Sequence, residues 1–233
     1  MERLEVKKIN QFLVSCISFI ILGSCFKVMV LIEGVAEVRP VNAIPVPAGL
    51  FFGPLAGLGC AVGNLVSDLF GTLTATSVIG FAANFMAAYM PYRLWHIYVK
   101  EEPNVHSFHK LLVYVWITFV SALSASWMIA TGIWLFRDWV PDMAVIVFLN
   151  NFVFPILFGL PVFIVMTSDA VRIRCTKAPE SRLHIPDKWR KILINFYTVI
   201  LLFLMLLTIF GENRTMATVL SVPALILTIL IIV

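Results

Sequence analysis

Residues 49–71 read "GLFFGPLAGLGCAVGNLVSDLFG", and this stretch decides how often the chain crosses a membrane. It is apolar and long enough for one transmembrane helix, because about 20 such residues span the hydrocarbon core. Two features argue against an ordinary lipid-facing span. Gly53-Pro54 breaks the stretch near its start, and Asn64 and Asp68 occupy positions where such a helix would carry leucines.

The composition predicts a polytopic helical membrane protein. Of 233 residues, 61% are hydrophobic and 13% are charged, whereas soluble domains carry about 25% charged residues. The apolar runs do not alternate with a period of two, which argues against an outer-membrane barrel. We therefore predict an all-α fold, a bundle of membrane helices. The long, nearly uncharged runs are residues 11–32, 111–136, 143–167 and 191–210.

Several functions receive no support from the sequence. The net charge of +4 comes from basic residues clustered in short loops, where they orient a membrane protein rather than bind nucleic acid. The four cysteines show no CxxC or Cys/His spacing that would predict a metal site or a disulfide. GxSxG, HExxH and Walker motifs are also missing from the sequence. We expect no enzyme activity, no cofactor and no bound metal.

Basic residues predict the orientation of the chain. They gather before the first span and within residues 93–110 and 168–191, whereas residues 34–45 hold only Arg39. Because short cytoplasmic loops carry an excess of Lys and Arg, these three basic regions are predicted to be cytoplasmic. The protein is then a multi-pass protein of the cell membrane.

This orientation fixes whether the number of membrane crossings within residues 44–92 is odd or even. Residues 11–33 lead from inside to outside, so residues 44–92 must cross an odd number of times. Reading 45–69 as one helix gives two crossings and places the basic loops outside. A split at Gly53-Pro54 gives three crossings and puts both termini in the cytoplasm. Pro54 suits the first turn of a new helix, where its missing N–H is not needed.

The difficulty is the length of the first short helix. Residues 44–53 span only about 15 Å at 1.5 Å per residue. Such an element must be shielded by protein rather than lipid, or must start earlier, near Pro40. A re-entrant hairpin is the competing interpretation.

The predicted map has a six-helix membrane domain and a C-terminal hairpin. The domain covers residues 1–170, a basic cytoplasmic loop covers 171–190, and a transmembrane hairpin covers 191–233. The predicted helices are 11–33, 44–53, 54–70, 76–98, 110–136 and 142–168, followed by 191–210 and 215–233.

Polar residues inside these spans are the candidates for a binding site, since polar groups at membrane depth are costly and mark function by default. Asn64 and Asp68 are four residues apart and share one helix face. The polar groups converge on the outer side, where an apolar pocket with a few placed donors and acceptors would bind a small molecule. The predicted substrate-binding residues are Arg39, Asn42, Asn64, Asp68, Asn84 and Asn150.

Structural roles compete with binding at each position. Asparagines in membrane bundles often bridge helices, and each such hydrogen bond contributes about 0.6–2 kcal/mol to stability. Asp68 could instead cap a helix end or lie in the water interface. Arg39 could serve as an interfacial anchor or pair with Glu37 or Glu33.

The region 42–95 resembles the substrate-binding S components of energy-coupling factor (ECF) transporters, and the riboflavin-type S components most. The likeness rests on "FGPLAG" at 52–57, the Asn at 64 and "GFAANFMAAYMPYRL" at 80–94. It implies six helices, a substrate site near the outer face and a covering loop after the first helix. It also implies capture of a vitamin or similar solute, with uptake powered by a separate ATPase module and its transmembrane coupling subunit.

Two other functions compete with transport. Membrane sensor domains of the MASE type have a comparable start and an Asn-containing helix, but they feed a cytoplasmic signalling domain. This chain ends in "LILTILIIV" instead. An integral-membrane enzyme acting on lipids has no motif in its favour.

Overall fold

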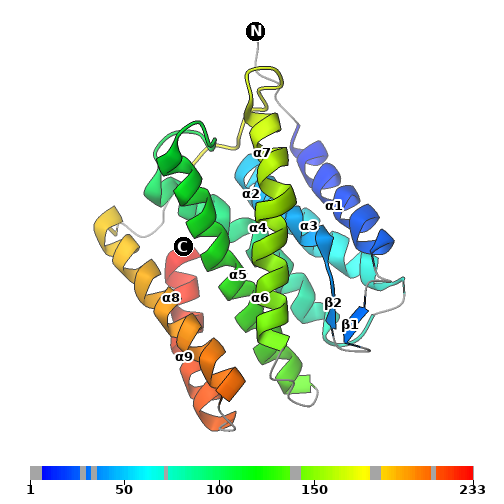
Figure 1. The fold of residues 1–233 in the computed structure, drawn as a ribbon, viewed down its shortest axis with the longest axis vertical. Helices are drawn as coiled ribbons and strands as arrows, with labels where there is room; N and C mark the ends of the chain where they lie inside the picture. The colour runs from blue at the N-terminus through cyan, green and yellow to red at the C-terminus, as the bar shows by residue number, and fades with distance from the viewer. Residues whose placement is uncertain are drawn as a thin grey trace.

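The structure is a computed structural model that describes residues 7–26, 30–32, 36–70, 73–136, 143–178, 185–210 and 214–232. It is a bundle of helices with one short antiparallel ribbon (Figure 1). Among the described residues, four helices are long and apolar enough to cross a membrane: Lys8–Cys25, Phe108–Ile133, Met143–Thr167 and Asp187–Leu207. The predicted all-α membrane bundle with a C-terminal helical hairpin is confirmed.

The elements follow one another without a separate soluble domain in the described part of the chain. The ribbon consists of β1 (Val30–Ile32) and β2 (Ala36–Glu37), and a 3-10 turn, η1 (Pro40–Ala43), leads into α2. A π-helical turn, η2 (Pro155–Gly159), joins α6 to α7. The α-helices are α1 (Lys8–Cys25), α2 (Pro45–Phe52), α3 (Pro54–Asp68), α4 (Ser77–Tyr98), α5 (Phe108–Phe136), α6 (Met143–Phe154), α7 (Leu160–Thr167), α8 (Asp187–Phe210) and α9 (Arg214–Ile232).

Large apolar side chains cover the outside of the bundle. Ile17 of α1, Leu157 of η2 and Phe203 of α8 are each at least half exposed. Soluble monomers rarely expose such apolar surface over a wide area. The outer surface is therefore suited to lipid.

The first helix is shorter than predicted. The expected helix 11–33 begins at Lys8 and ends at Cys25, and its last predicted residues instead form β1. Val30 pairs with Glu37 and Ile32 with Ala36. Because Val30 and Ile32 are β-branched and β2 supplies hydrogen-bonding partners, extended structure replaces the helix there. Residue 33 of this predicted helix, residues 34 and 35 of the predicted loop, the turn at Pro141 and residues 211–213 lie outside the described residues.

The predicted break at Gly53-Pro54 is confirmed. α2 ends at Phe52, Gly53 adopts φ 58° and ψ −131°, and α3 begins at Pro54. This left-handed conformation favours glycine. A Cβ at Gly53 would also lie 3.2 Å from ring atoms of Tyr92.

The short second helix is shielded entirely by protein. Every residue of α2 is buried, and η1 extends the helical path back to Pro40, as the length of this segment required. A Cβ at Gly49 would lie 1.9 Å from the carbonyl oxygen of Ala88, so α2 packs backbone to backbone against α4. Phe51 packs against Phe163 of α7 with ring centroids 5.1 Å apart. Satisfied backbone groups and a protein environment make so short an element tolerable at membrane depth.

The predicted helix 142–168 is continuous but changes its winding at η2 (Figure 1). Pro155 and Pro161 lack the N–H groups that an α-helix would use at these positions. The Tyr114 hydroxyl donates to the Pro155 carbonyl oxygen at 3.2 Å. A Cβ at Gly159 would lie 2.7 Å from the carbonyl oxygen of Ala43, so this glycine admits the backbone of η1.

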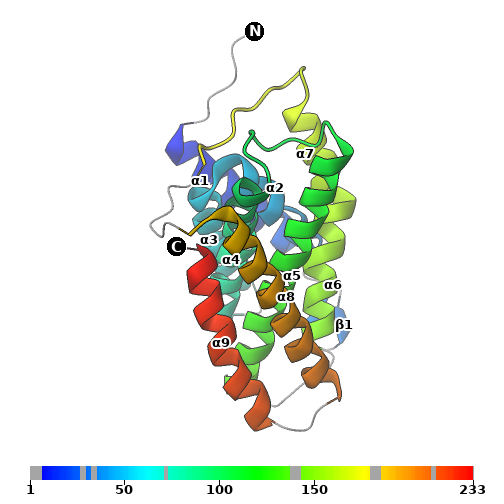
Figure 2. The ribbon, with the colours of Figure 1, turned by 90° about the vertical axis from the view of Figure 1, so that its left-hand side faces the viewer.

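In the C-terminal hairpin, α8 packs against α5 and α9 packs against α8 (Figure 2). The Tyr197 hydroxyl of α8 donates to Ser124 of α5 at 2.9 Å, and Thr228 of α9 donates to Tyr197 at 3.0 Å. Trp127 of α5 donates to Ser221 of α9 at 3.1 Å. These hydrogen bonds attach both hairpin helices to the rest of the bundle.

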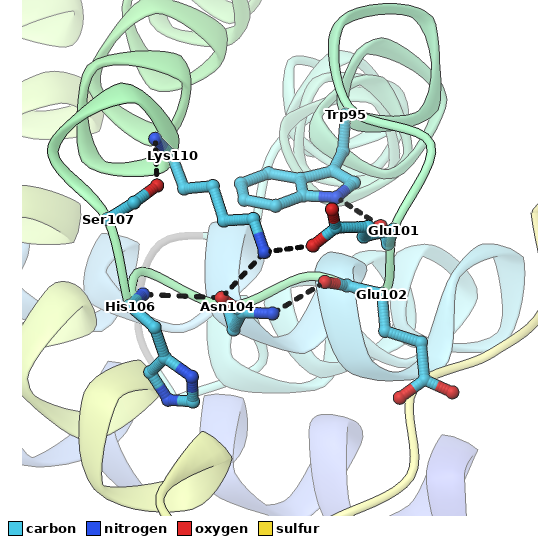
Figure 3. Close-up of polar contacts among 7 residues, drawn as sticks. All are labelled: Trp95, Glu101, Glu102, Asn104, His106, Ser107 and Lys110. Atoms are coloured by element: carbon cyan, nitrogen blue, oxygen red, sulfur yellow. Dashed lines mark hydrogen bonds and ion pairs between the residues drawn. The ribbon is translucent and has the colours of Figure 1, made fainter.

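The loop between α4 and α5 is held by a compact set of polar contacts (Figure 3). Asn104 accepts from Lys110 at 3.1 Å, and the Ser107 hydroxyl caps α5 by accepting the Lys110 N–H at 3.3 Å. Trp95 donates to the backbone oxygen of Glu101 at 3.0 Å. Lys110 also bonds the Glu101 carboxylate and lowers its pKa.

The basic regions lie at one end of the bundle, here termed the basic end. It holds the start of α1, the α4–α5 loop and the segment 168–178 after α7 (Figure 1). The other end, termed the ribbon end, carries β1 and β2. Segments that the positive-inside rule assigns to one side of a membrane therefore share one end of the molecule.

We predict that the basic end faces the cytoplasm. A single cysteine placed at His106, an exposed loop residue, should resist a membrane-impermeant thiol reagent in intact cells. It should react once the cells are permeabilised. The native cysteines are replaced beforehand, and equal labelling in both states would overturn the orientation.

Candidate functional site

Arg39 is the centre of a polar network near the ribbon end. Its backbone N–H donates to Oδ1 of Asn150 on α6 at 3.1 Å, and its Nη2 donates to Oδ1 of Asn64 on α3 at 3.0 Å. Arg39 directly precedes η1, where the chain turns into the bundle. Arg39 thus connects α6 and α3. Its backbone bonds Asn150, and its guanidinium bonds Asn64, which is 86 residues earlier in the chain.

Asn64 bridges Arg39 to an acidic group. Its Nδ2 donates to Oδ2 of Asp68 at 3.3 Å. The two residues are four positions apart and share one face of the helix, as predicted. Asn64 is 1% exposed and Asp68 is 8% exposed. The amide therefore accepts from a cation through its oxygen and donates to an anion through its nitrogen. We refer to Arg39, Asn64, Asp68 and Asn150 as the polar network.

Gly80 of α4 lies against the Asn64 side chain of the network. A Cβ there would lie 2.9 Å from Nδ2 of Asn64, so a larger residue would push against this amide. Sequence reasoning missed this residue. The available signal was a glycine within a membrane span, which permits close approach of a neighbouring helix.

The two remaining predicted site residues lie beside the network. Nδ2 of Asn84 donates to the Gly80 carbonyl oxygen at 2.8 Å, within its own helix. The backbone N–H of Asn42 donates to the Arg39 carbonyl oxygen at 3.0 Å, and its side chain is buried. Neither side chain hydrogen-bonds Arg39, Asn64, Asp68 or Asn150 in the part of the chain that the structure describes.

The structure shows one partner of the Arg39 side chain. Its guanidinium bonds the buried Asn64, so this side chain is more than an interfacial anchor. The side chains of Glu33 and Glu37 lie outside the described residues.

The network suits recognition of a polar solute by its chemistry. A guanidinium offers N–H donors in a fixed plane, a carboxylate accepts, and carboxamides do both. Arg39 is half-buried and Asp68 is buried, and Asn64 hydrogen-bonds both of them. Among the described residues, no group of three or more His, Cys, Asp and Glu side chains could hold a metal ion.

The chain matches no protein-family model, no curated protein and no solved structure. Its function is therefore proposed from the geometry of the polar network, together with the likeness of residues 42–95.

We predict that Arg39 and Asn64 are energetically coupled. Arg39→Gln and Asn64→Ala should each lower the free energy of unfolding by about 1–3 kcal/mol, since the first removes the guanidinium donor from the buried Asn64 oxygen and the second removes both hydrogen bonds of the Asn64 amide. The double variant should lose less than the sum, by at least about 0.5 kcal/mol. Thermal unfolding in detergent measures all three.

Thr118→Val provides the control, because the Thr118 hydroxyl donates to the carbonyl oxygen of Tyr114 in its own helix and has no other hydrogen bond among the described residues. Its effect should add to that of Arg39→Gln within about 0.5 kcal/mol. Additivity of the Arg39 and Asn64 variants would contradict the bridge.

Proposed function

We propose that this chain is the substrate-capture subunit of an ECF-type importer for a vitamin or similar small solute. The solute is bound from the ribbon end, which is the extracellular side in this proposal. The supporting observation is the buried network that joins Arg39, Asn64 and Asp68 to Asn150. It lies toward the end opposite the basic loops, where an importer must first meet its solute.

The chemistry of the network supports binding. Bridging two helices requires no charge, yet this network contains a guanidinium and a buried carboxylate. A solute with donors and acceptors would replace the hydrogen bonds that Asn64 makes with Arg39 and Asp68. These three side chains would then supply convergent polar groups to the solute.

The chain around Arg39 is suited to cover a solute. β2 ends at Glu37, two residues before Arg39, and Asn150 holds the Arg39 backbone. Release of this hydrogen bond would free the segment between β2 and η1. This matches the covering loop after the first helix that the likeness to S components implies.

Energy for uptake must come from other subunits in this proposal. The sequence has no Walker motif or other nucleotide-binding motif. The partners are then an ECF transmembrane coupling subunit and its ATPase subunits, which assemble with this chain in the cell membrane.

Assembly with the ECF module is the first test. The tagged chain, co-expressed with the coupling subunit and ATPases of its host, should recover that module from detergent-solubilised membranes in stoichiometric amounts. Its failure to do so, with all partners well expressed, would contradict the importer and favour the sensor interpretation.

Solute binding is the second test. Small molecules that copurify with the native protein should be absent from Asn64→Leu and Asp68→Leu, because each variant removes a bridging polar group. Mass spectrometry of the denatured protein measures them. Asn151→Leu is the matched control, since Asn151 is a buried asparagine whose one hydrogen bond among the described residues goes to the Val147 carbonyl oxygen of its own helix. Identical solute content in all four proteins would contradict the site.

A further inference from the structure

We infer that residues 39–53 form a buried strut that couples the polar network to the basic segment 171–178. The strut consists of Arg39, η1, α2 and Gly53. Its two ends contact different functional regions, and its middle is enclosed by protein. A change at either end is therefore transmitted through the bundle to the other.

The strut begins at Arg39, here termed its outer end, and finishes at Gly53, its inner end. The outer end is held by the network. Asn150 accepts the Arg39 backbone N–H, and Asn64 accepts from the Arg39 guanidinium. A few residues on, the Ala43 carbonyl oxygen lies against Gly159 in the π-helical turn. Such turns occur often at functional sites in helices. Arg39 is the first residue of the strut, so a solute that rearranges Arg39 acts directly on the strut.

The inner end of the strut holds the basic segment. The Thr176 backbone N–H donates to the Phe51 carbonyl oxygen at 2.7 Å. Tyr92, whose ring lies against Gly53, donates its hydroxyl to the Lys177 carbonyl oxygen at 2.7 Å. These two hydrogen bonds fix neighbouring residues of the basic segment. Displacement of Phe51 along the strut would break or shift the first of them.

The middle of the strut transmits displacement rather than absorbing it. α2 has eight residues, all buried, and closely packed interiors do not compress. At Gly49 the backbone lies directly on Ala88 of α4, without a side chain to interlock. Packed helices shift past each other by about 1–2 Å in shear motions. The smooth contact at Gly49 permits such a shift along the strut axis.

The coupling is reciprocal. If rearrangement at Arg39 changes the free energy of the contacts at Thr176 and Lys177, then those contacts change the network by the same amount. Within the importer proposed above, a partner that grips the basic segment would thereby change the affinity for solute. The coupling itself requires neither solute nor partner, so it is tested apart from the importer function.

Cys175 is a native probe of the inner end. It is 7% exposed, and its thiol lies 3.8 Å from the Pro103 carbonyl oxygen of the α4–α5 loop. With Cys16, Cys25 and Cys60 replaced, its rate of reaction with a maleimide in detergent reports how often the segment opens. Asn150→Ala and Arg39→Gln should each raise this rate at least about fivefold, although both changes lie at the opposite end of the strut.

Asn151→Ala is the matched control. It removes a neighbouring buried asparagine of the same helix, whose amide hydrogen-bonds Val147 alone within the described part of the chain. The Cys175 rate should stay at the native value in this variant. An equal rise in Asn150→Ala and Asn151→Ala would show general loosening of the bundle and would overturn the strut.

Reciprocity supplies the reverse measurement. A Val41→Cys variant without native cysteines places a probe at a buried position of η1. Tyr92→Phe, which removes only the hydroxyl bonded to Lys177, should raise its labelling rate. Arg39→Gln should raise it as well. No rise at Cys175 in Arg39→Gln overturns the coupling, whether or not the Val41→Cys probe responds.

Discussion

The placement of the polar network depends on the burial of α2. Inside a bilayer no water is present to satisfy backbone groups, and each unsatisfied group costs several kcal/mol. A helix of eight residues leaves terminal groups well below the membrane surface, so protein must supply its surroundings. α4 does so at Gly49, α7 does so at Phe51, and Gly159 admits the carbonyl oxygen of Ala43. Shielding this short element brings α3, α4 and the α6–α7 helix together.

The polar network follows from the same constraint. Because α2 is short, the chain that precedes it enters the bundle at Arg39 rather than at the surface. Asn150 accepts the Arg39 backbone N–H, and Asn64 accepts from the Arg39 guanidinium, so two helices hold this half-buried residue. Asn64 in turn donates to the buried Asp68. The interrupted helical segment therefore brings these polar groups together.

Much of this arrangement follows from the sequence, since membrane helices are specified by long apolar runs and by charge. The break at Gly53-Pro54 was predictable because basic loops fix the parity of crossings, and α3, α4 and α5 begin within two residues of the predicted positions. Four of the six predicted site residues share one network. Asn84 and Asn42 do not, because each makes its hydrogen bond locally.

Other features depend on contacts that no local pattern encodes. β1 forms because β2 is available as a partner, whereas its apolar sequence reads equally well as the end of α1. Asn150 bonds the backbone N–H of residue 39, and the identity of that side chain does not predict such a bond. The role of Gly80 depends on which helix α3 packs against. Long-range packing decides all three positions.

The distribution of interactions along the strut connects these observations. Hydrogen bonds occur at its ends, at Arg39 and at Phe51, whereas its middle contact at Gly49 is backbone packing against Ala88, with no hydrogen bond there among the described residues. Hydrogen bonds depend steeply on distance and angle, so a small axial shift changes them strongly. Van der Waals packing has no comparable dependence on angle. An element built in this way concentrates the energetic effect of its movement at the two ends, where the network and the basic segment lie.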